Sequence, residues 1–203
     1  MPSSATLTTL RDRVEAYLVD ATNTIWATGT IDEGLRLALH EYSLARPQRA
    51  IGTITLAAAA REVALSSLTG LIGVERVWFP YVAADPEYPP NWILWSVFDN
   101  AGAFTLFLDV KALPAVDDVV RVFYRKLQTL NGLDSAAATT FAVEDDSLLV
   151  LAAAGHACYS RIADLAEDPS AAADAEAALQ ATGDRCLAVA RAMLAKRTGW
   201  VGP

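Results

Sequence analysis

Apolar residues change their spacing twice along the chain, and this change constrains the fold more than any other feature. Near the N-terminus they recur at helical intervals, as at Leu10 and Val14, which predicts a helix over Thr6–Asp20. A second helix is predicted to begin with a capping box formed by Thr30 and Glu33. It should end before Pro47, which lacks an amide donor. We expect these two helices to pair antiparallel.

Alternating spacing follows Ile51 and predicts short strands. In the last of them, Arg121 and Arg125 share the face opposite the apolar residues. Nine of the 17 aromatic residues lie between Trp78 and Phe107, which favours a compact β layer because aromatic rings suit pleated surfaces. The expected strands are residues 53–57, 62–65, 74–82, 92–98, 103–110 and 118–126, with a hairpin turn at residues 99–102.

Helical spacing returns after Val143 and predicts two long helices, Asp145–Ala166 and Ala171–Lys196. The chain is therefore predicted to be an α+β protein, in which N- and C-terminal helices form a small bundle around an inserted antiparallel β layer. The expected division is residues 1–50 and 127–197 for the bundle, with a connecting loop at 127–143. Residues 51–126 form the β subdomain and residues 198–203 a tail.

The junction between the β layer and the third helix, residues 127–157, has a distinctive composition. Asn131 and Gly132 accept positive φ in a turn, and a small polar connection runs from Ser135 to Thr140. An acidic run then precedes an alanine-rich helix, whose N-terminal amides favour negative charge: Glu144, Asp145 and Asp146.

This junction, together with the order of elements over residues 7–166, resembles the head-to-tail connector adaptor proteins of tailed bacteriophages. The shared features are an opening helix, a Trp-containing loop at residues 20–26, a second helix ending before proline, a β portion and an Ala/Gly-rich helix. The resemblance implies a structural virion protein of the neck, made in the host cytoplasm, that forms a dodecameric ring beneath the portal. The implied partners are the portal protein and the adjacent neck or tail-completion protein. The resemblance also implies that DNA passes through the ring without specific binding and that no membrane is involved.

The overall charge is consistent with such a role. Sixteen Lys and Arg against 24 Asp and Glu give a net charge of −8, which argues against a basic groove for nucleic acid.

The N-terminal residues lack the pattern of a secretory signal, and the apolar run Leu148–Gly155 is too short to span a bilayer. Two cysteines, Cys158 and Cys186, make neither a disulfide framework nor a zinc site.

No residue pattern indicates catalysis, a metal site or a cofactor. His156 and Cys158 are two positions apart on a predicted helix and point in different directions, while His40 has no accompanying nucleophile motif. The pair Asp117 and Asp118 lacks the spacing of a calcium loop, and no phosphate-binding glycine motif occurs. We therefore expect a protein that is not an enzyme.

Two segments are candidates for partner binding. Trp200 lies in a Gly/Pro-flanked tail that the resemblance assigns to the portal, and a large aromatic in such a segment is a typical interface anchor. The expected portal-binding residues are Thr198, Gly199, Trp200, Val201, Gly202 and Pro203. The hairpin tip is the expected contact with a neighbour or the next neck component, through Phe98, Asp99, Asn100 and Phe104.

Two other functions remain open from the sequence. The chain is compatible with another neck protein, such as a stopper or tail-completion subunit. It is also compatible with a small soluble enzyme or ligand-binding protein that uses the aromatic β pocket, since Trp92 and Trp95 are placed to line a groove.

Overall fold

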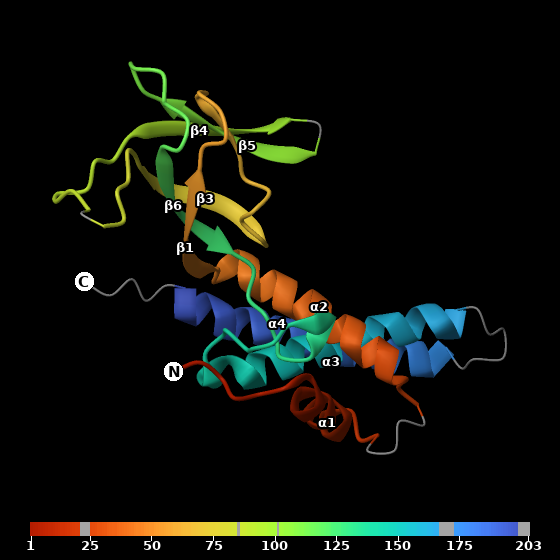
Figure 1. The fold of residues 1–203 in the computed structure, drawn as a ribbon. Coiled ribbons are helices and arrows are strands. Elements are labelled where there is room, and N and C mark those ends of the chain that lie inside the picture. The colour runs from red at the N-terminus through yellow and green to blue at the C-terminus, as the bar shows by residue number, and fades with distance from the viewer. Residues whose placement is uncertain (21–24, 85, 101, 167–172, 199–203) are drawn as a thin grey trace. The chain divides into compact units, whose positions relative to one another are not determined.

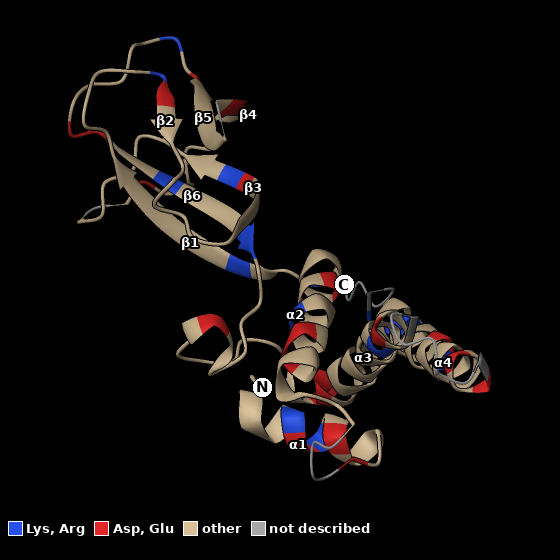
Figure 2. Cartoon of the chain, turned by 90° about the vertical axis from the view of Figure 1, so that its right-hand side faces the viewer, with Lys and Arg blue, Asp and Glu red and all other residues tan. Residues whose placement is uncertain are grey.

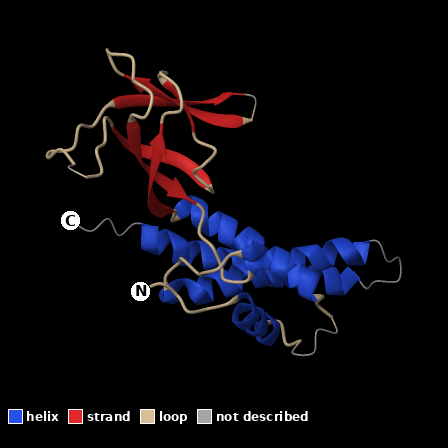
Figure 3. Cartoon of the chain, viewed as in Figure 1, coloured by secondary structure: helices blue, strands red, loops and turns tan. Residues whose placement is uncertain are grey.

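The computed structural model describes residues 1–20, 25–84, 86–100, 102–166 and 173–198 (Figure 1). The chain divides into two compact units, a helical unit of residues 1–46 with 128–203 and a β unit of residues 47–127. Four α-helices and two three-stranded antiparallel sheets make up the described part (Figure 3), which confirms the predicted α+β fold with helices from both ends of the chain.

The helical unit is built around α3, Asp146–Ala166, which packs against each of the other helices: α1 Leu7–Tyr17, α2 Thr28–Ala45 and α4 Ala173–Thr198. The expected neighbours α1 and α2 are in contact, and Arg11 of α1 forms an ion pair with Asp32 of α2, but both helices also pack on α3. Small residues allow the close packing. A Cβ on Gly34 of α2 would lie 2.7 Å from the Ala153 carbonyl oxygen of α3, and one on Gly183 of α4 would lie 3.3 Å from the Gly155 carbonyl oxygen of α3. Glycine has a low helix propensity, but at position 183 it allows α4 to pack closely against α3.

The start of α2 differs from the prediction. The helix begins at Thr28 with Ala27 at the N-cap, and no side chain caps it, so the expected capping box at Thr30 and Glu33 is wrong. The Asp20 carboxylate accepts hydrogen bonds from the backbone amides of Ile25 and Trp26, each at 2.8 Å, and this organises the chain before the helix begins. A reciprocal capping box does occur in α1, between Thr6 and Thr9.

The β unit contains two sheets rather than one layer. One has the order β1–β6–β3 and the other β2–β5–β4. The strands are β1 Gln48–Thr55, β2 Glu62–Ala64, β3 Leu71–Trp78, β4 Leu94–Asn100, β5 Ala103–Asp109 and β6 Val119–Lys126. The sheets enclose a shared core to which β6 contributes Val120 and Val122, and β5 contributes Leu106 and Leu108. β1 begins five residues earlier than predicted, because pairing with β6 extends from Thr55 back to Gln48.

Candidate functional site

One carboxylate of the acidic run before α3, that of Asp145, is the centre of an ion cluster. Val143–Asp145 makes a 3₁₀ turn directly before α3, and Asp145 is fully buried. Its Oδ2 accepts hydrogen bonds from the Tyr42 hydroxyl at 2.7 Å and from Arg46 Nη1 at 2.8 Å. Arg197 Nε lies 2.8 Å from Oδ1. The predicted role of this carboxylate as a helix-start charge is thus incomplete, because it also joins α2 and α4 to the start of α3.

Burial and the neighbouring carboxylate both act on Tyr42. Desolvation, followed by the hydrogen bond and the charge of Asp145, raises the pKa of the Tyr42 hydroxyl well above its ordinary value of 10.0. The hydroxyl therefore stays protonated and remains a donor. Tyr42 lies in the last turn of α2 and Arg46 is the C-cap of that helix, four positions later, but nothing in their local sequence points to Asp145.

The end of α4 is held at this cluster. Besides the ion pair with Asp145, Arg197 Nη2 donates to the Glu144 carbonyl oxygen at 2.9 Å. Thr198 is the last residue of α4, so the expected boundary between helix and tail at residue 198 is one residue too early. The remaining residues predicted to bind the portal, 199–203 with Trp200, lie outside the described part of the chain.

The predicted hairpin is present. Asn100 pairs with Ala103, and the Asp99 side chain accepts a hydrogen bond from the Gly102 amide at 2.7 Å. Gly102 has a φ of +86°, a conformation that glycine adopts without strain. Phe98 and Phe104 are both exposed, but the register puts them on opposite faces, since Phe98 pairs with Thr105 and Asp99 pairs with Phe104. A single partner surface therefore meets only one of the two rings.

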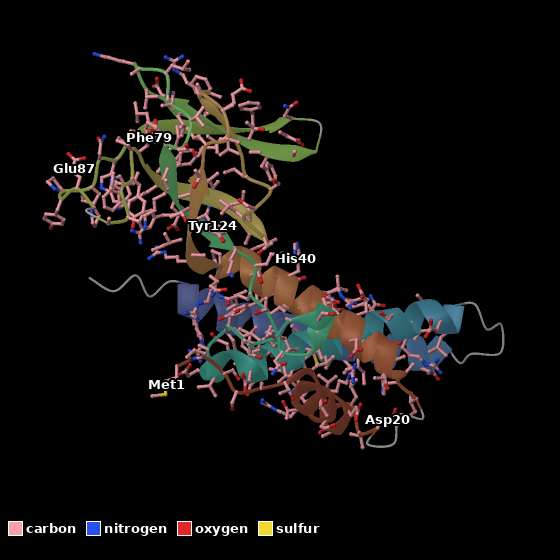
Figure 4. The ribbon with its side chains drawn as sticks, in the orientation of Figure 1. Met1, Asp20, His40, Phe79, Glu87 and Tyr124 are labelled. Carbon is pink, nitrogen blue, oxygen red and sulfur yellow. The ribbon has the colours of Figure 1, made fainter. Side chains whose placement is uncertain are left out.

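The two histidines lie in different environments, and both cysteines are buried. His40 is exposed on α2 (Figure 4), whereas the His156 side chain is mostly buried, with Nε2 3.5 Å from Glu41 Oε1. Burial lowers the pKa of His156. Cys158 and Cys186 are both buried free thiols, and burial raises the pKa of Cys158 to about 11. Among the described residues, no group of three or more His, Cys, Asp or Glu side chains could hold a metal ion.

One helix is apolar and long enough to cross a membrane by length and composition. It spans residues 143–165 and thus corresponds to α3. Half of it is buried, and it lies at the centre of the helical unit. A central helix of a water-soluble bundle has the same length and composition, so this feature by itself is weak evidence for a membrane.

The two tryptophans expected to line a groove lie in different places. Trp95 is partly buried against the β core and lines an apolar pocket of about 240 Å³ together with Val97 and Phe104. Trp92 is 42% exposed and lines a second pocket of about 400 Å³ that arginines border. The sequence predicted aromatic residues at a groove, but did not separate these two environments.

No family model matches the chain, and a search of curated proteins found no match either.

Proposed function

We propose that this chain is a structural protein of the bacteriophage virion neck, a head–tail connector adaptor. Twelve copies would form a ring between the portal and the next neck or tail component. The proposal rests on the resemblance of residues 7–166 to that family. Two helices, an inserted β unit and two further helices are the order of elements in this structure, which supports the proposal.

The observation that carries the mechanism is the fixed end of α4. Arg197 contacts both Asp145 and the backbone of Glu144, so the last turn of α4 is held in place directly before the segment that contains Trp200 in the sequence. A short segment containing one tryptophan binds a partner most effectively when its attachment point is already ordered, because less entropy is lost on docking. The tail with Trp200 would bind the portal, and the helical unit would supply the lateral contacts of the ring.

Charge is consistent with a DNA channel. Residues 1–46 and 128–203 contain nine Lys and Arg against 16 Asp and Glu, and twelve copies would multiply this negative charge around the ring. Part of this charge facing the lumen would repel the DNA phosphates and prevent adhesion during passage.

Electron microscopy of the intact chain, mixed with the portal protein encoded in the same genome, tests the proposal. We expect repeated copies in a closed ring on the portal, even if the free chain is a monomer or a small oligomer. Density for a single copy in the neck, or no attachment, would contradict it.

Truncation after Arg197 tests the tail separately. The truncated chain keeps the Arg197 contacts and should retain its thermal stability while losing attachment to the portal. Arg197→Ala in the full chain is the matched variant, since it keeps the tail but releases the end of α4. Normal attachment of the truncated chain would place the portal contact elsewhere. Unfolding of the truncated chain would show instead that Trp200 belongs to the core.

The apolar pocket beside Trp95 favours one other function, a small ligand-binding protein. Its walls come from β3, β4 and β5, with Leu71, Val74, Trp95 and Phe104 among them. An uncharged apolar ligand suits this lining. Quenching of tryptophan fluorescence by such a ligand, lost in Trp95→Ala but retained in Trp92→Ala, would support this function.

A further inference from the structure

Several arginines lie together on the outer face of sheet β1–β6–β3, although the net charge of the chain is negative. On β6, Val120, Val122 and Tyr124 are buried in the core, so Arg121 and Arg125 lie on the opposite face. The register adds residues from both neighbouring strands to this face. Figure 2 marks the Lys and Arg positions along these strands in blue. We call it the arginine face and define it by Arg49, Arg76, Trp78, Trp92, Arg121 and Arg125.

Aromatic rings hold two of these arginines in place. The Arg121 guanidinium carbon lies 4.6 Å from the Tyr81 ring centroid, and Nη1 donates to the Tyr81 hydroxyl at 2.6 Å. The Arg76 guanidinium carbon lies 5.3 Å from the Trp92 ring centroid. Cation–π contacts of this kind orient a guanidinium without neutralising its charge.

Carboxylates are scarce on this face. In the helical unit, every arginine except Arg185 has a carboxylate oxygen within 4.0 Å among the described residues. On the arginine face only Arg49 has one, from Glu75 at 3.5 Å. Arg76, Arg121 and Arg125 have no described carboxylate within that distance. Close positive charges repel each other, so an anionic partner would stabilise them.

Unsatisfied donors mark the place where such a partner would bind. Trp78 is 7% exposed, and its Nε1 has no hydrogen-bond acceptor among the described residues, as is also true of Arg121 Nε. Trp78 lines the pocket of about 400 Å³, together with Arg49, Glu75, Arg76, Pro90, Trp92 and Phe123. A buried N–H group without a partner is costly, and the side chain that carries one of these two groups, Trp78, forms part of the pocket wall.

We propose that the arginine face docks the acidic helical unit of a second copy of this chain, with a carboxylate entering the pocket beside Trp78. The charges of the two units are complementary. The helical unit carries nine Lys and Arg against 16 Asp and Glu, whereas the β unit carries seven against eight and concentrates four of its arginines on this face. Exposed side chains such as Glu144 and Asp174 have no described basic partner within 4.0 Å and are available for this contact.

A protein partner fits this face better than nucleic acid. Trp, Tyr and Arg are the residues that dominate protein–protein interfaces. A polyphosphate strand would approach a β unit with an excess of acidic residues, in a chain of net charge −8. Two copies of the chain also repel each other at long range. At physiological salt, however, the Debye length of about 8 Å screens that repulsion, while close ion pairs persist.

Paramagnetic relaxation between copies tests this contact in the intact protein. Chains labelled with ¹⁵N are mixed at physiological salt with unlabelled chains carrying a nitroxide at Thr53→Cys, an exposed position that pairs with Arg121. We expect broadening of amide signals from the helical unit of the ¹⁵N chains. Arg76→Glu or Arg125→Glu in the nitroxide chains should reduce it severalfold. Lys111→Glu is the matched control, because it makes the same charge change at an exposed position outside the arginine face and should leave the broadening unchanged.

Three results would overturn the inference: no broadening between copies, broadening confined to the β unit, or broadening that both charge reversals leave intact. Binding of an oligothymidylate that shifts β6 signals and requires Arg76 would assign the face to nucleic acid instead. The inference deepens the proposed function by naming a lateral surface of the ring. Failure of this inference can be told apart from failure of the proposed function. Attachment to the portal is measured in a separate experiment, and a ring could form on the portal through other lateral contacts.

Discussion

Tyr42 donates its hydroxyl to the fully buried carboxylate of Asp145 over 2.7 Å, although the two residues are 103 positions apart. Arg46 and Arg197 complete the cluster around that carboxylate. α2, the start of α3 and the end of α4 therefore converge on one side chain. Removing any one member of this cluster leaves the others without their partner.

Replacing the charge at the centre of the cluster should be costly. Asp145→Asn leaves two arginines without their counter-charge, and we expect a loss of about 3 kcal/mol in the free energy of unfolding. A larger loss is not expected, because both arginines are partly exposed and can be rehydrated. Urea denaturation measures this loss. The control is Glu144→Gln, which changes an exposed neighbour and should stay within about 0.5 kcal/mol of wild type. Equal stability of the two variants would show that the cluster contributes little.

The close approach of α2 to α3 leaves no room for a methyl group at Gly34. A Cβ there would lie 2.7 Å from a backbone oxygen, which cannot move without shifting α3, so Gly34→Ala should destabilise the protein by about 1–3 kcal/mol. Gly29→Ala is the matched control on the same helix, because nothing lies within 4 Å of its Cβ position. That variant should be as stable as wild type or up to about 1 kcal/mol more stable. A stabilising effect of Gly34→Ala would contradict this packing.

His156 should make stability depend on pH. Burial, with a smaller effect of Arg191, lowers its pKa below 6.5 in the folded state, while Glu41 acts in the opposite direction. The unfolded chain therefore binds the proton more readily than the folded chain does. The stability that neutral His156 contributes is complete above pH 6.5 and is lost as the pH falls from 6.5 through the folded-state pKa. The free energy of unfolding at several pH values measures this loss. His156→Gln should flatten the profile in that window, and an unchanged profile in this variant would contradict the prediction.

The Cys158 thiol should be unreactive in the folded protein. Its pKa is raised to about 11 by burial, so little thiolate forms at pH 8, and the side chain is inaccessible. An aromatic disulfide reagent at pH 8 should modify Cys158 only after a denaturant is added. Ser67→Cys places a thiol at an exposed position of the β unit and should react at once in the native state. Rapid native modification of Cys158 would show that α3 separates from its neighbours.

The sequence by itself determined the order and kind of the elements. Helical spacing located α1, α3 and α4, although α1 ends three residues before the predicted Asp20. Alternation located β2, β5 and β6 to within one residue at each end, because these signals depend on neighbours along the chain. Local motifs were less reliable. A Thr-x-x-Glu pattern at Thr30 did not form a cap, since hydrogen bonds to Asp20 set the entry to α2 instead.

Only the tertiary structure decided which distant residues meet. The division of six strands into two sheets, the central place of α3 and the convergence of Tyr42, Arg46 and Arg197 on Asp145 all depend on contacts between remote segments. The arginine face is the clearest case. The alternation of Arg121 and Arg125 was visible along β6, but Arg49 and Arg76 join them only through strand register. A spacing pattern shows which way a side chain points within its element, whereas register and packing determine what lies beside it.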